Sequence, residues 1–341
     1  MFASPPTCDD QPIWDLWLSS LWLPSVTVAS ELGVFEALAG GPRRSAGVAE
    51  QLRLNPRGCD TLLRMLVALD LAVLDGGEYQ LAPVARQYLL KNDPFYWGHV
   101  WPASAGANAN HARLRDALMI RPVSPPDDSP GPLSAWESGQ IDADLAGRIA
   151  RFMNSHSMAA AVGLSRNADF SGVRRLLDVG GGSGCFSIAL AARNPDLRCT
   201  VMDLPAMCRA AEEYIAAAGA HERVDTVNVD MFRQPWPRGY DALFFSNVFH
   251  DWSFETCAEL ASKARACLPG GGRILLHEML LKDTGTGPRT AAAFSMLMLA
   301  GTRGQQFTSA ELRDLLAAAG FADISVTPSY GYYSLVSGHK P

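Results

Sequence analysis

The sequence of 341 residues has no uninterrupted apolar run long enough to cross a membrane. Its most apolar early stretch, residues 14–38, is broken by Asp15, Pro24 and Glu31. The first ten residues, MFASPPTCDD, carry acids where a secretory signal needs positive charge. The seven cysteines are an odd number, and no two have the CxxC spacing. We therefore expect a protein of the reducing cytoplasm, with neither a membrane anchor nor an export signal.

Basic residues are also fewer than acidic ones. Lys and Arg total 29 against 35 for Asp and Glu, which gives a net charge of −6. No cluster of bases acts locally against that balance, so nucleic acid and anionic membranes are poor partners.

The first part of the chain has a helical pattern. From Trp14 to Leu90 apolar residues recur three and four apart, and residues 46–81 show helix, helix and a small β-hairpin, the order of a winged helix. The candidate recognition helix, 55–71, has only Arg57 and Arg64 as bases, so a structural or dimer-forming role is favoured over DNA binding. The proline-rich stretch Pro122 to Pro132 predicts an exposed loop.

The second part alternates short apolar runs with helical segments. Strands separated by helices predict parallel βαβ units, an α/β doubly wound sheet and a ligand at the carboxyl ends of its strands. The expected domains are residues 1–95, a helical linker with pocket helices at 96–165, and the α/β domain at 166–341. The predicted strands are RRLLDV, CTVMDL, VDTVNVD, YDALFFSNVF, RILLHEML, ADISVTP and YYSLVSG.

A glycine-rich turn follows the first of these strands in LLDVGGGSG. A dinucleotide fingerprint would place its third glycine at position 185, which is Cys185. The acid before the glycines, Asp178, would repel a phosphate but suits a cationic ligand, and S-adenosylmethionine carries an ammonium and a sulfonium.

Acids also end the next two strands. Asp203 can accept hydrogen bonds from two ribose hydroxyls, while Asp230 and Met231 suit an adenine amine and its face. Each acid taken singly is equally typical of a helix cap. Their occurrence at successive strand ends favours one cofactor site.

These motifs, with NVFHDW, LPGGGRILLHEMLL and FTSAELRDLLAAAGF, resemble the caffeate-type small-molecule O-methyltransferases of plants and of bacterial natural-product pathways. GVFEAL, LLRMLVALDLAVL and YQLAPVARQYL resemble that family's winged-helix dimerisation domain. The resemblance implies a Rossmann-like, seven-stranded class I methyltransferase domain, S-adenosylmethionine as cofactor, a small aromatic substrate and a homodimer. It implies that His250 is the general base and that Glu278 orients it. Two departures are Ser246, where the family has a lysine near the methionine carboxylate, and Gln306, where it has a second glutamate.

The candidate site residues combine the strand-end pattern with what the resemblance implies, including the helix with Phe152, Met153, His156 and Ser157 as a wall of the substrate pocket. The catalytic candidates are His250, Glu278 and Asp251. The cofactor candidates are Asp178, Gly180, Gly182, Gly184, Asp203, Leu204, Asp230, Met231, Phe232, Ser246, Asn247 and Ser157. The substrate candidates are Trp97, Trp101, Phe152, Met153, His156, Phe249, Met296 and Gln306. No metal ligand set is expected, although relatives that methylate the carbon of 2-oxo acids use iron.

Methyl transfer from a sulfonium is an in-line displacement, so the protein must mainly align the nucleophile and remove its proton. A phenol with a pKa of about 10 and an imidazole at about 6.5 differ by roughly 3.5 units, or about 5 kcal/mol. A positive charge about 4 Å from the forming phenolate contributes on the order of 4 kcal/mol at an effective dielectric constant of about 20. A weak base therefore suffices.

Several alternatives stay open at this point. Asp251 either orients the imidazole or caps the following helix. His277 and Glu278 are neighbours on a strand, so only one faces the site, and we choose Glu278. Trp97 and Trp101 form either an aromatic pocket or core. The rival functions are methylation at carbon, a non-methylating protein that binds the cofactor, and a winged-helix regulator.

Overall fold

The computed structural model describes residues 5–101, 105, 108–120 and 136–341. The predicted loop from Pro122 to Pro132 lies outside these residues. The described chain forms two compact units. The sheet unit contains residues 5–11, 136–280 and 309–341, and the helical unit contains residues 12–101, 105, 108–120 and 281–308.

This division differs from the expected boundaries in three places. Residues 5–11, which we placed with the helical domain, belong to the sheet unit. Residues 143–165, which we placed in a linker, belong to the sheet unit, because the helix they form packs on helices of that unit. Residues 281–308, which we placed in the α/β domain, belong to the helical unit. The chain therefore leaves the sheet unit after Leu280 and returns to it at Ser309.

The helical unit contains the predicted winged-helix order. Pro56 occupies the first turn of its longest early helix, and the Asn55 side chain caps that helix by accepting from the Gly58 N–H. The following strands, β1 (Ala72–Asp75) and β2 (Glu78–Leu81), form an antiparallel hairpin. The described helices of this unit are α1 (Gln11–Leu18), η1 (Ser19–Leu21), α2 (Trp22–Glu31), α3 (Val34–Ala39), α4 (Ser45–Leu52), α5 (Pro56–Ala68), α6 (Pro83–Tyr88), α8 (Ala109–Leu118) and α14 (Arg289–Gly301).

The sheet unit is built on seven strands in the order β5-β4-β3-β6-β7-β9-β8. All seven predicted strands are confirmed. The central strands β3, β6 and β7 are buried along most of their length, which gives the continuous apolar runs seen in the sequence. The strands are β3 (Arg175–Val179), β4 (Arg198–Asp203), β5 (Val224–Asn228), β6 (Ala242–Ser246), β7 (Arg273–Met279), β8 (Ala322–Tyr330) and β9 (Tyr333–His339). Strand β9 runs antiparallel to both β7 and β8, and the other pairs are parallel.

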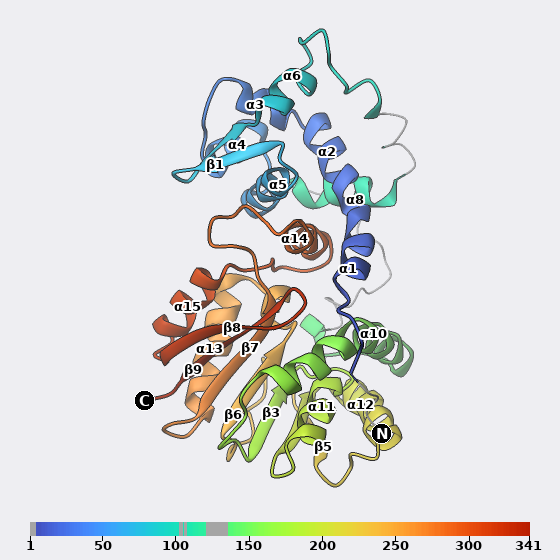
Figure 1. Cartoon of the computed structure of the whole chain (residues 1–341), viewed down its shortest axis with the longest axis vertical. Coiled ribbons are helices and arrows are strands. Elements are labelled where there is room, and N and C mark those ends of the chain that lie inside the picture. The colour runs from blue at the N-terminus through green and yellow to red at the C-terminus, as the bar shows by residue number, and fades with distance from the viewer. Residues whose placement is uncertain (1–4, 102–104, 106–107, 121–135) are drawn as a thin grey trace. The chain divides into compact units, whose positions relative to one another are not determined.

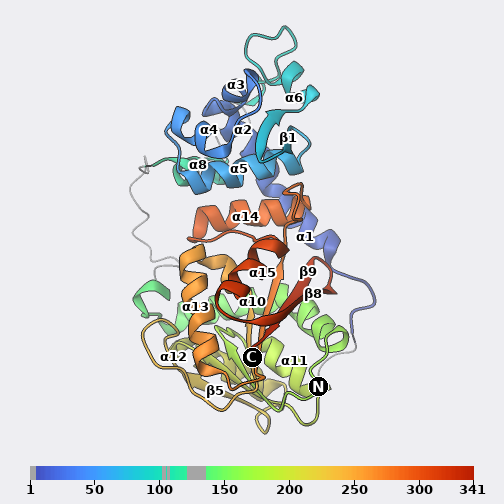
Figure 2. The ribbon, with the colours of Figure 1, turned by 90° about the vertical axis from the view of Figure 1, so that its left-hand side faces the viewer.

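Helices cover both faces of this sheet. Figure 1 shows α10, α11 and α12 gathered on one side and α13 with α15 on the other. Figures 1 and 2 both show α15 beside the β8–β9 hairpin, on which it packs. These helices are α10 (Ala143–Asn167), α11 (Cys185–Arg193), α12 (Pro205–Ala217), α13 (Phe254–Cys267) and α15 (Ser309–Ala318).

The topology determines where a site can form. Strands β3, β4, β5, β6 and β7 are parallel, so their carboxyl ends meet at one edge of the sheet. The turns that follow them carry the acids and glycines singled out in the sequence. No helix in the described part of the chain is both long enough and apolar enough to span a bilayer.

Candidate active site

The glycine-rich turn joins β3 to α11. Gly180, Gly182 and Gly184 all have positive φ, at 69°, 57° and 73°, which explains why glycine occupies these positions. Gly180 and Gly182 line a pocket at the sheet edge, whereas a Cβ on Gly184 would lie 3.2 Å from Val201 on β4. The first two glycines therefore shape the pocket, and the third lets the helix approach the strand.

Asp203 ends β4 and faces the same pocket. Its Oδ2 accepts from the Gly182 N–H at 3.0 Å, and its Oδ1 accepts from the Leu204 N–H at 2.7 Å. Burial raises the pKa of this carboxyl to about 6, against the opposing effect of the two N–H groups. Asp203 is thus fixed in orientation at the place predicted for a ribose contact.

Asp178 lies beneath the turn and accepts from the Ser187 hydroxyl at 2.7 Å. Burial raises its pKa to about 7. A Cβ on Gly181 would lie 2.7 Å from the Asp178 carboxyl carbon, so the carboxyl packs against the backbone of the turn. It supports the turn, and its predicted attraction for a cationic ligand stays a prediction.

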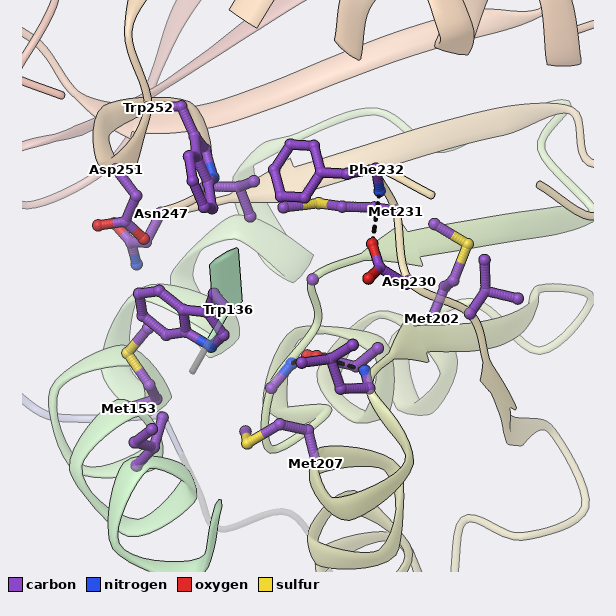
Figure 3. A pocket seen from close by; sticks show the side chains of 17 residues that line it. Trp136, Met153, Met202, Met207, Asp230, Met231, Phe232, Asn247, Asp251 and Trp252 are labelled. Carbon is purple, nitrogen blue, oxygen red and sulfur yellow. Dashed lines mark hydrogen bonds between the residues drawn. The ribbon is translucent and has the colours of Figure 1, made fainter. Parts of the chain in front are cut away.

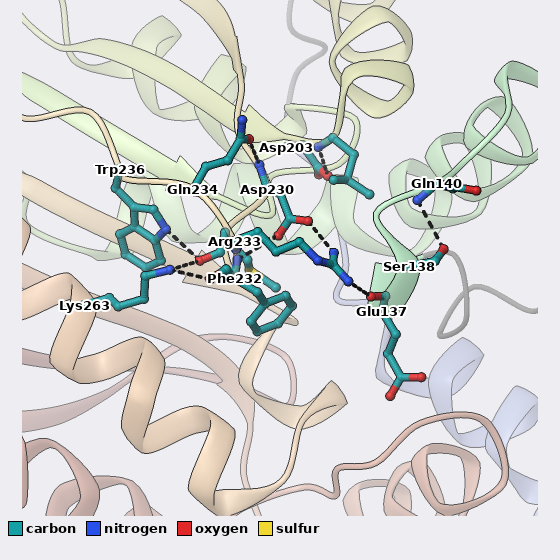
Figure 4. Close-up of polar contacts among 12 residues, drawn as sticks. Glu137, Ser138, Gln140, Asp203, Asp230, Phe232, Arg233, Gln234, Trp236 and Lys263 are labelled. Atoms are coloured by element: carbon teal, nitrogen blue, oxygen red, sulfur yellow. Dashed lines mark hydrogen bonds and ion pairs between the residues drawn. The ribbon is translucent and has the colours of Figure 1, made fainter.

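The turn after β5 is held by a dense set of polar contacts (Figure 4). Asp230 Oδ1 accepts from the N–H groups of Phe232 and Arg233, at 2.9 and 3.1 Å. The Met231 carbonyl accepts from Trp236 Nε1 at 2.9 Å and from Lys263 Nζ at 2.6 Å. The backbone of residues 230–232 is therefore fixed by side chains from two elements.

Arg233 links this turn to a distant segment. One guanidinium nitrogen donates to Asp230 Oδ2 at 2.6 Å, and another donates to the backbone carbonyl of Glu137 (Figure 4). Burial acts to raise the pKa of Asp230, but the bonds from Arg233 and the backbone outweigh it, and the pKa is lowered. Much of the acceptor capacity predicted for an adenine amine is used inside the protein.

The pocket brings most of the predicted cofactor residues together (Figure 3). Its polar side chains are three aspartates and one asparagine, and none of its described lining residues is Lys, Arg or His. Flat or soft apolar groups form its other walls, including Phe232 and Trp252, whose rings meet edge to face at 4.6 Å. The pocket is lined by Trp136, Ile149, Met153, Gly180, Gly182, Met202, Asp203, Leu204, Met207, Val229, Asp230, Met231, Phe232, Asn247, Val248, Asp251 and Trp252.

The sequence motifs missed several of these walls. Trp136 lies in the segment held by Arg233, while Ile149 on α10 and Met207 on α12 belong to a cluster against which Trp136 packs. None of the three lies at a strand end or in a recognisable motif. The apolar residues at the start of α12 could have drawn attention to Met207. Packing in the core accounts for them equally well, so they did not predict a pocket wall.

His250 and Glu278 meet at the ends of β6 and β7. His250 Nδ1 lies 2.9 Å from Glu278 Oε2, and Glu278 Oε1 accepts from the N–H groups of Val248 and Phe249, at 3.2 and 3.0 Å. Burial acts to lower the pKa of His250, but the charge and hydrogen bond of Glu278, with Asp251 contributing, leave it raised. Glu278 thus fixes the ring and strengthens it as a base.

Asp251 lies beside this pair, with Oδ1 3.8 Å from His250 Nε2. Burial raises the pKa of Asp251 to about 7. The alternative that Asp251 caps the following helix is wrong, because the Ser253 side chain accepts from the Thr256 N–H and caps α13. Asp251 lines the pocket instead.

His277 points away from Glu278, as the alternation along β7 predicted. Its ring stacks on Tyr333 at 4.9 Å, and its nitrogens lie 3.0 and 2.8 Å from the hydroxyls of Ser246 and Ser329. Burial lowers its pKa to about 3, so the ring is neutral. Ser246 is therefore engaged with His277, and its predicted cofactor contact stays a prediction.

Of the substrate candidates on α10, His156 lies close enough to His250 for their charges to interact. His156 Nδ1 lies 3.2 Å from the Ser157 hydroxyl, and its ring meets Phe152 at 5.0 Å. Burial, together with the charge of His250, lowers the pKa of His156 to about 4. His156 is therefore uncharged at neutral pH, and Met153 one turn away lines the pocket.

The remaining substrate candidates are divided between the two units. Phe249 is fully buried, and its ring packs against Phe245 in the core, at 5.2 Å. Trp97 and Trp101 line an apolar hollow of the helical unit. Met296 lies buried on α14, and the Gln306 N–H donates to the Ser295 hydroxyl at 2.8 Å, also within the helical unit. Their contact with substrate stays a prediction.

The part of the chain that the structure describes contains no group of side chains suited to bind a metal ion. Within residues 5–101, 105, 108–120 and 136–341, no three His, Cys, Asp or Glu side chains are grouped so as to hold an ion.

Two family models match the chain. An O-methyltransferase domain matches residues 130–322, and an O-methyltransferase dimerisation domain matches residues 14–91. Among curated relatives, the 3-hydroxy-5-methyl-1-naphthoate 3-O-methyltransferase of Streptomyces sahachiroi is 35% identical, over 94% of this chain and 93% of that protein. The L-tyrosine C(3)-methyltransferase of Streptomyces lavendulae is 29% identical, over 87% of this chain and 82% of that protein.

A solved structure shows the same fold over nearly the whole chain. It is an O-methyltransferase family 2 protein from Planctomyces limnophilus in complex with apigenin. The TM-score is 0.86 at 27% identity, and the match covers 99% of this chain and 98% of that one.

Proposed function

Since this chain belongs to the O-methyltransferase family and is an S-adenosylmethionine-dependent methyltransferase, we propose that it methylates a phenolic oxygen of a small aromatic molecule. In this proposal His250 is the general base and Glu278 positions it. The observation that carries the assignment is the 2.9 Å contact between His250 Nδ1 and Glu278 Oε2 beside the pocket.

The pocket fits S-adenosylmethionine in both charge and shape. Its charged side chains are all aspartates on the described walls, and the cofactor presents donors and positive charge: ribose hydroxyls, an adenine amine, an ammonium and a sulfonium. Asp203, already oriented by two N–H groups, would hold the ribose. Met231 and Phe232, on a turn fixed by Lys263, would flank the adenine.

When bound, the cofactor supplies an electrophilic methyl group on a positively charged sulfur. The protein's part is to deprotonate and align the acceptor. Because Nδ1 of His250 donates to Glu278, the lone pair lies on Nε2, and Nε2 takes the phenolic proton. The negative charge of Glu278 then stabilises the imidazolium.

Raising the pKa of His250 narrows its mismatch with a phenol. An unperturbed imidazole is weaker than a phenolate by roughly 3.5 pKa units, and each unit is worth about 1.36 kcal/mol. Glu278 moves His250 in the direction that reduces this gap. His156, held neutral nearby, does not compete for the proton.

The names of the relatives support an aromatic hydroxyl as acceptor. The Streptomyces sahachiroi protein is named for a hydroxynaphthoate, and the Planctomyces limnophilus protein was solved with apigenin, a phenolic flavone. Methylation at carbon is the rival, since another relative is named for the ring carbon of tyrosine. Both reactions begin with the same deprotonation by His250.

The test is incubation of the purified protein with S-adenosylmethionine and a panel of hydroxynaphthoates, flavones and tyrosine. Mass spectrometry detects the methylated product, and NMR of the new methyl group separates oxygen from carbon. We expect an O-methyl product whose formation is about a hundred- to ten-thousandfold slower in His250→Ala. Consumption of the cofactor without loss of rate in that variant would remove the base assignment. No S-adenosylhomocysteine with any phenol would favour the non-methylating alternative.

The dimerisation domain at residues 14–91 supports a homodimer as the working assembly, which analytical ultracentrifugation tests directly. The reducing cytoplasm remains the expected compartment, on the sequence argument alone.

A further inference from the structure

Three arginines lie side by side at the amino edge of the sheet, opposite the edge that carries the active site. Arg175 begins β3 and Arg198 begins β4, and the two are direct partners in the parallel pairing of these strands. Arg223 continues the row, because it immediately precedes Val224, which pairs with Cys199 on β4. Like charges on directly paired residues destabilise a sheet, so strand pairing gives no reason for the row.

The three arginines line one cavity, which has a volume of about 200 Å³. His221 adds a fourth basic side chain to its wall. These bases are spread between positions 175 and 223, so no run of Lys or Arg in the sequence announces them. We expected no local cluster of bases from the sequence, but the fold assembles one.

Each guanidinium is held by a neutral partner. Arg198 Nη1 donates to the Glu222 carbonyl at 2.6 Å, and Arg223 Nη1 donates to two carbonyls at the end of α11. The guanidinium carbon of Arg175 lies 4.9 Å from the centre of the Tyr240 ring. No carboxylate in the described part of the chain forms an ion pair with any of the three. Their charges are therefore not cancelled by contact, and most of the five N–H donors of each stay available.

Acidic side chains near the cavity do not remove its positive charge. Glu222 and Asp225 lie on its wall, so three arginines against two acids leave an excess of one positive charge. Both acids are exposed, and solvent weakens their effect on the arginines. Asp241 is engaged elsewhere, since its Oδ2 accepts from the backbone N–H groups of Arg174 and Arg175, each at 2.8 Å.

We propose that this cavity binds a phosphoryl group that carries two or more negative charges. Guanidinium groups match the oxygens of phosphates and carboxylates, and an anion among the arginines would also relieve the repulsion within the row. A carboxylate presents two oxygens in one plane, which suit a single guanidinium. A phosphoryl group presents three oxygens around a tetrahedral centre, so three arginines on adjacent strands favour phosphate. The site is separate from the proposed methyl transfer and does not depend on it.

The test is calorimetric titration of the full-length protein at low salt with pyrophosphate, uridine diphosphate and citrate. We expect pyrophosphate to bind and citrate, a carboxylate of similar charge, to bind about tenfold more weakly. Uridine diphosphate separates the sources: an affinity near that of pyrophosphate assigns the site to any phosphoryl group, and tighter binding assigns it to an esterified one. Saturating S-adenosylhomocysteine should leave these affinities unchanged, because the pocket at the other edge is lined by acids.

Variants locate the anion. Arg198→Gln removes the middle charge of the row and should weaken pyrophosphate binding about ten- to hundredfold, whereas Arg198→Lys, which keeps the charge without the planar fork, should lose about three- to tenfold. Arg313→Gln on α15 is the matched control, because it removes one exposed positive charge outside the cavity, and it should change binding less than twofold. Arg175→Gln is the second variant if thermal unfolding shows that Arg198→Gln is not folded.

Three results would overturn the proposal. The first is native protein that does not bind pyrophosphate, or that binds citrate more tightly. The second is an equal loss in Arg198→Gln and Arg313→Gln, which would reduce the effect to overall charge. The third is displacement of pyrophosphate by S-adenosylhomocysteine, which would place the anion in the pocket at the carboxyl ends of the strands.

Discussion

The Glu278 carboxylate faces two ways: Oε2 lies 2.9 Å from His250 Nδ1, while Oε1 accepts two backbone N–H groups from the turn that carries His250. One side chain on β7 therefore fixes both the imidazole and the backbone beneath it. Glu278 is only 1% exposed, so water does not weaken these contacts.

Replacing Glu278 by Gln should move the pH dependence of the reaction. The charge of Glu278 raises the pKa of His250, and in the proposed role as general base His250 acts only when it is unprotonated. Without that charge the pKa falls, so the acid limb of the kcat/KM profile should shift to lower pH. The maximum rate should fall about ten- to hundredfold, because imidazolium loses its stabilising partner.

Asp251→Asn is the control for this shift. Its carboxyl lies 3.8 Å from Nε2 and makes the smaller contribution to the raised pKa, so its shift should be smaller. A merely structural role for Glu278 would lower the rate at all pH values and leave the midpoint in place.

Cofactor affinity should depend on the ionisation of Asp203. Burial holds its pKa at about 6, and only the carboxylate accepts from two ribose hydroxyls. Affinity should therefore rise with pH and level off above about pH 7, with roughly a tenfold gain in S-adenosylhomocysteine binding from pH 5 to pH 7. Calorimetric titration across that range measures the gain.

The same range contains the titration of Asp178 and Asp251, each with a pKa of about 7. Asp203→Asn isolates the relevant carboxyl: its binding should be weaker and should lack the tenfold step centred near pH 6. Persistence of that step in the variant would assign it to another group.

Arg233 should slow cofactor release. It joins Asp230 to the Glu137 carbonyl and so holds the segment that carries Trp136 on the pocket wall. The Arg233 side chain is 52% exposed, so the effect should be modest, about three- to tenfold faster dissociation in Arg233→Ala. Stopped-flow fluorescence can follow release through Trp136 and Trp252, which both line the pocket.

Arg233→Lys should behave like Arg233→Ala, because an ammonium lacks the planar fork that reaches two acceptors at once. Arg238→Ala removes the same charge a few residues away on an exposed position and should leave release unchanged. If Arg233→Ala and Arg238→Ala release the cofactor equally fast, the effect comes from the loss of positive charge and not from the contacts of Arg233.

Gly181 and Gly182 should respond differently to alanine. A Cβ on Gly181 would lie 2.7 Å from the Asp178 carboxyl carbon, so Gly181→Ala should lower the free energy of unfolding by about 1–3 kcal/mol. A Cβ on Gly182 meets nothing within 4 Å, so only its positive φ adds strain, about 1 kcal/mol. Urea denaturation measures both, and equal losses would contradict the packing of Asp178 on the turn.

The sequence predicted the site best where the position of a residue along a strand determines the direction of its side chain. Alternation along β7 placed His277 and Glu278 on opposite faces, and the structure confirms it through their separate partners. Parallel strands gather their carboxyl ends, so Asp203 and Asp230 could be assigned to one pocket from their order in the chain.

Contacts between distant segments escaped the sequence. Arg233 and Glu137 are 96 residues apart, and nothing local to either predicts that they meet. Asp251 was ambiguous for a different reason: two good capping residues lie within three positions, and the geometry of α13 selected Ser253. Trp136 could not be distinguished from an ordinary core residue, because its role depends on what it faces.

The position of β9 determines when β7, the strand that carries Glu278, can gain its second neighbour during synthesis. Glu278 pairs with Ser334, so β7 receives its second neighbour only after the ribosome has added residues 333–339. Until then one side of β7 presents unpaired N–H and C=O groups, the kind of edge that joins other nascent chains. A ribosome that stalls before residue 333 therefore leaves β7 with β6 as its single strand neighbour and with one open edge.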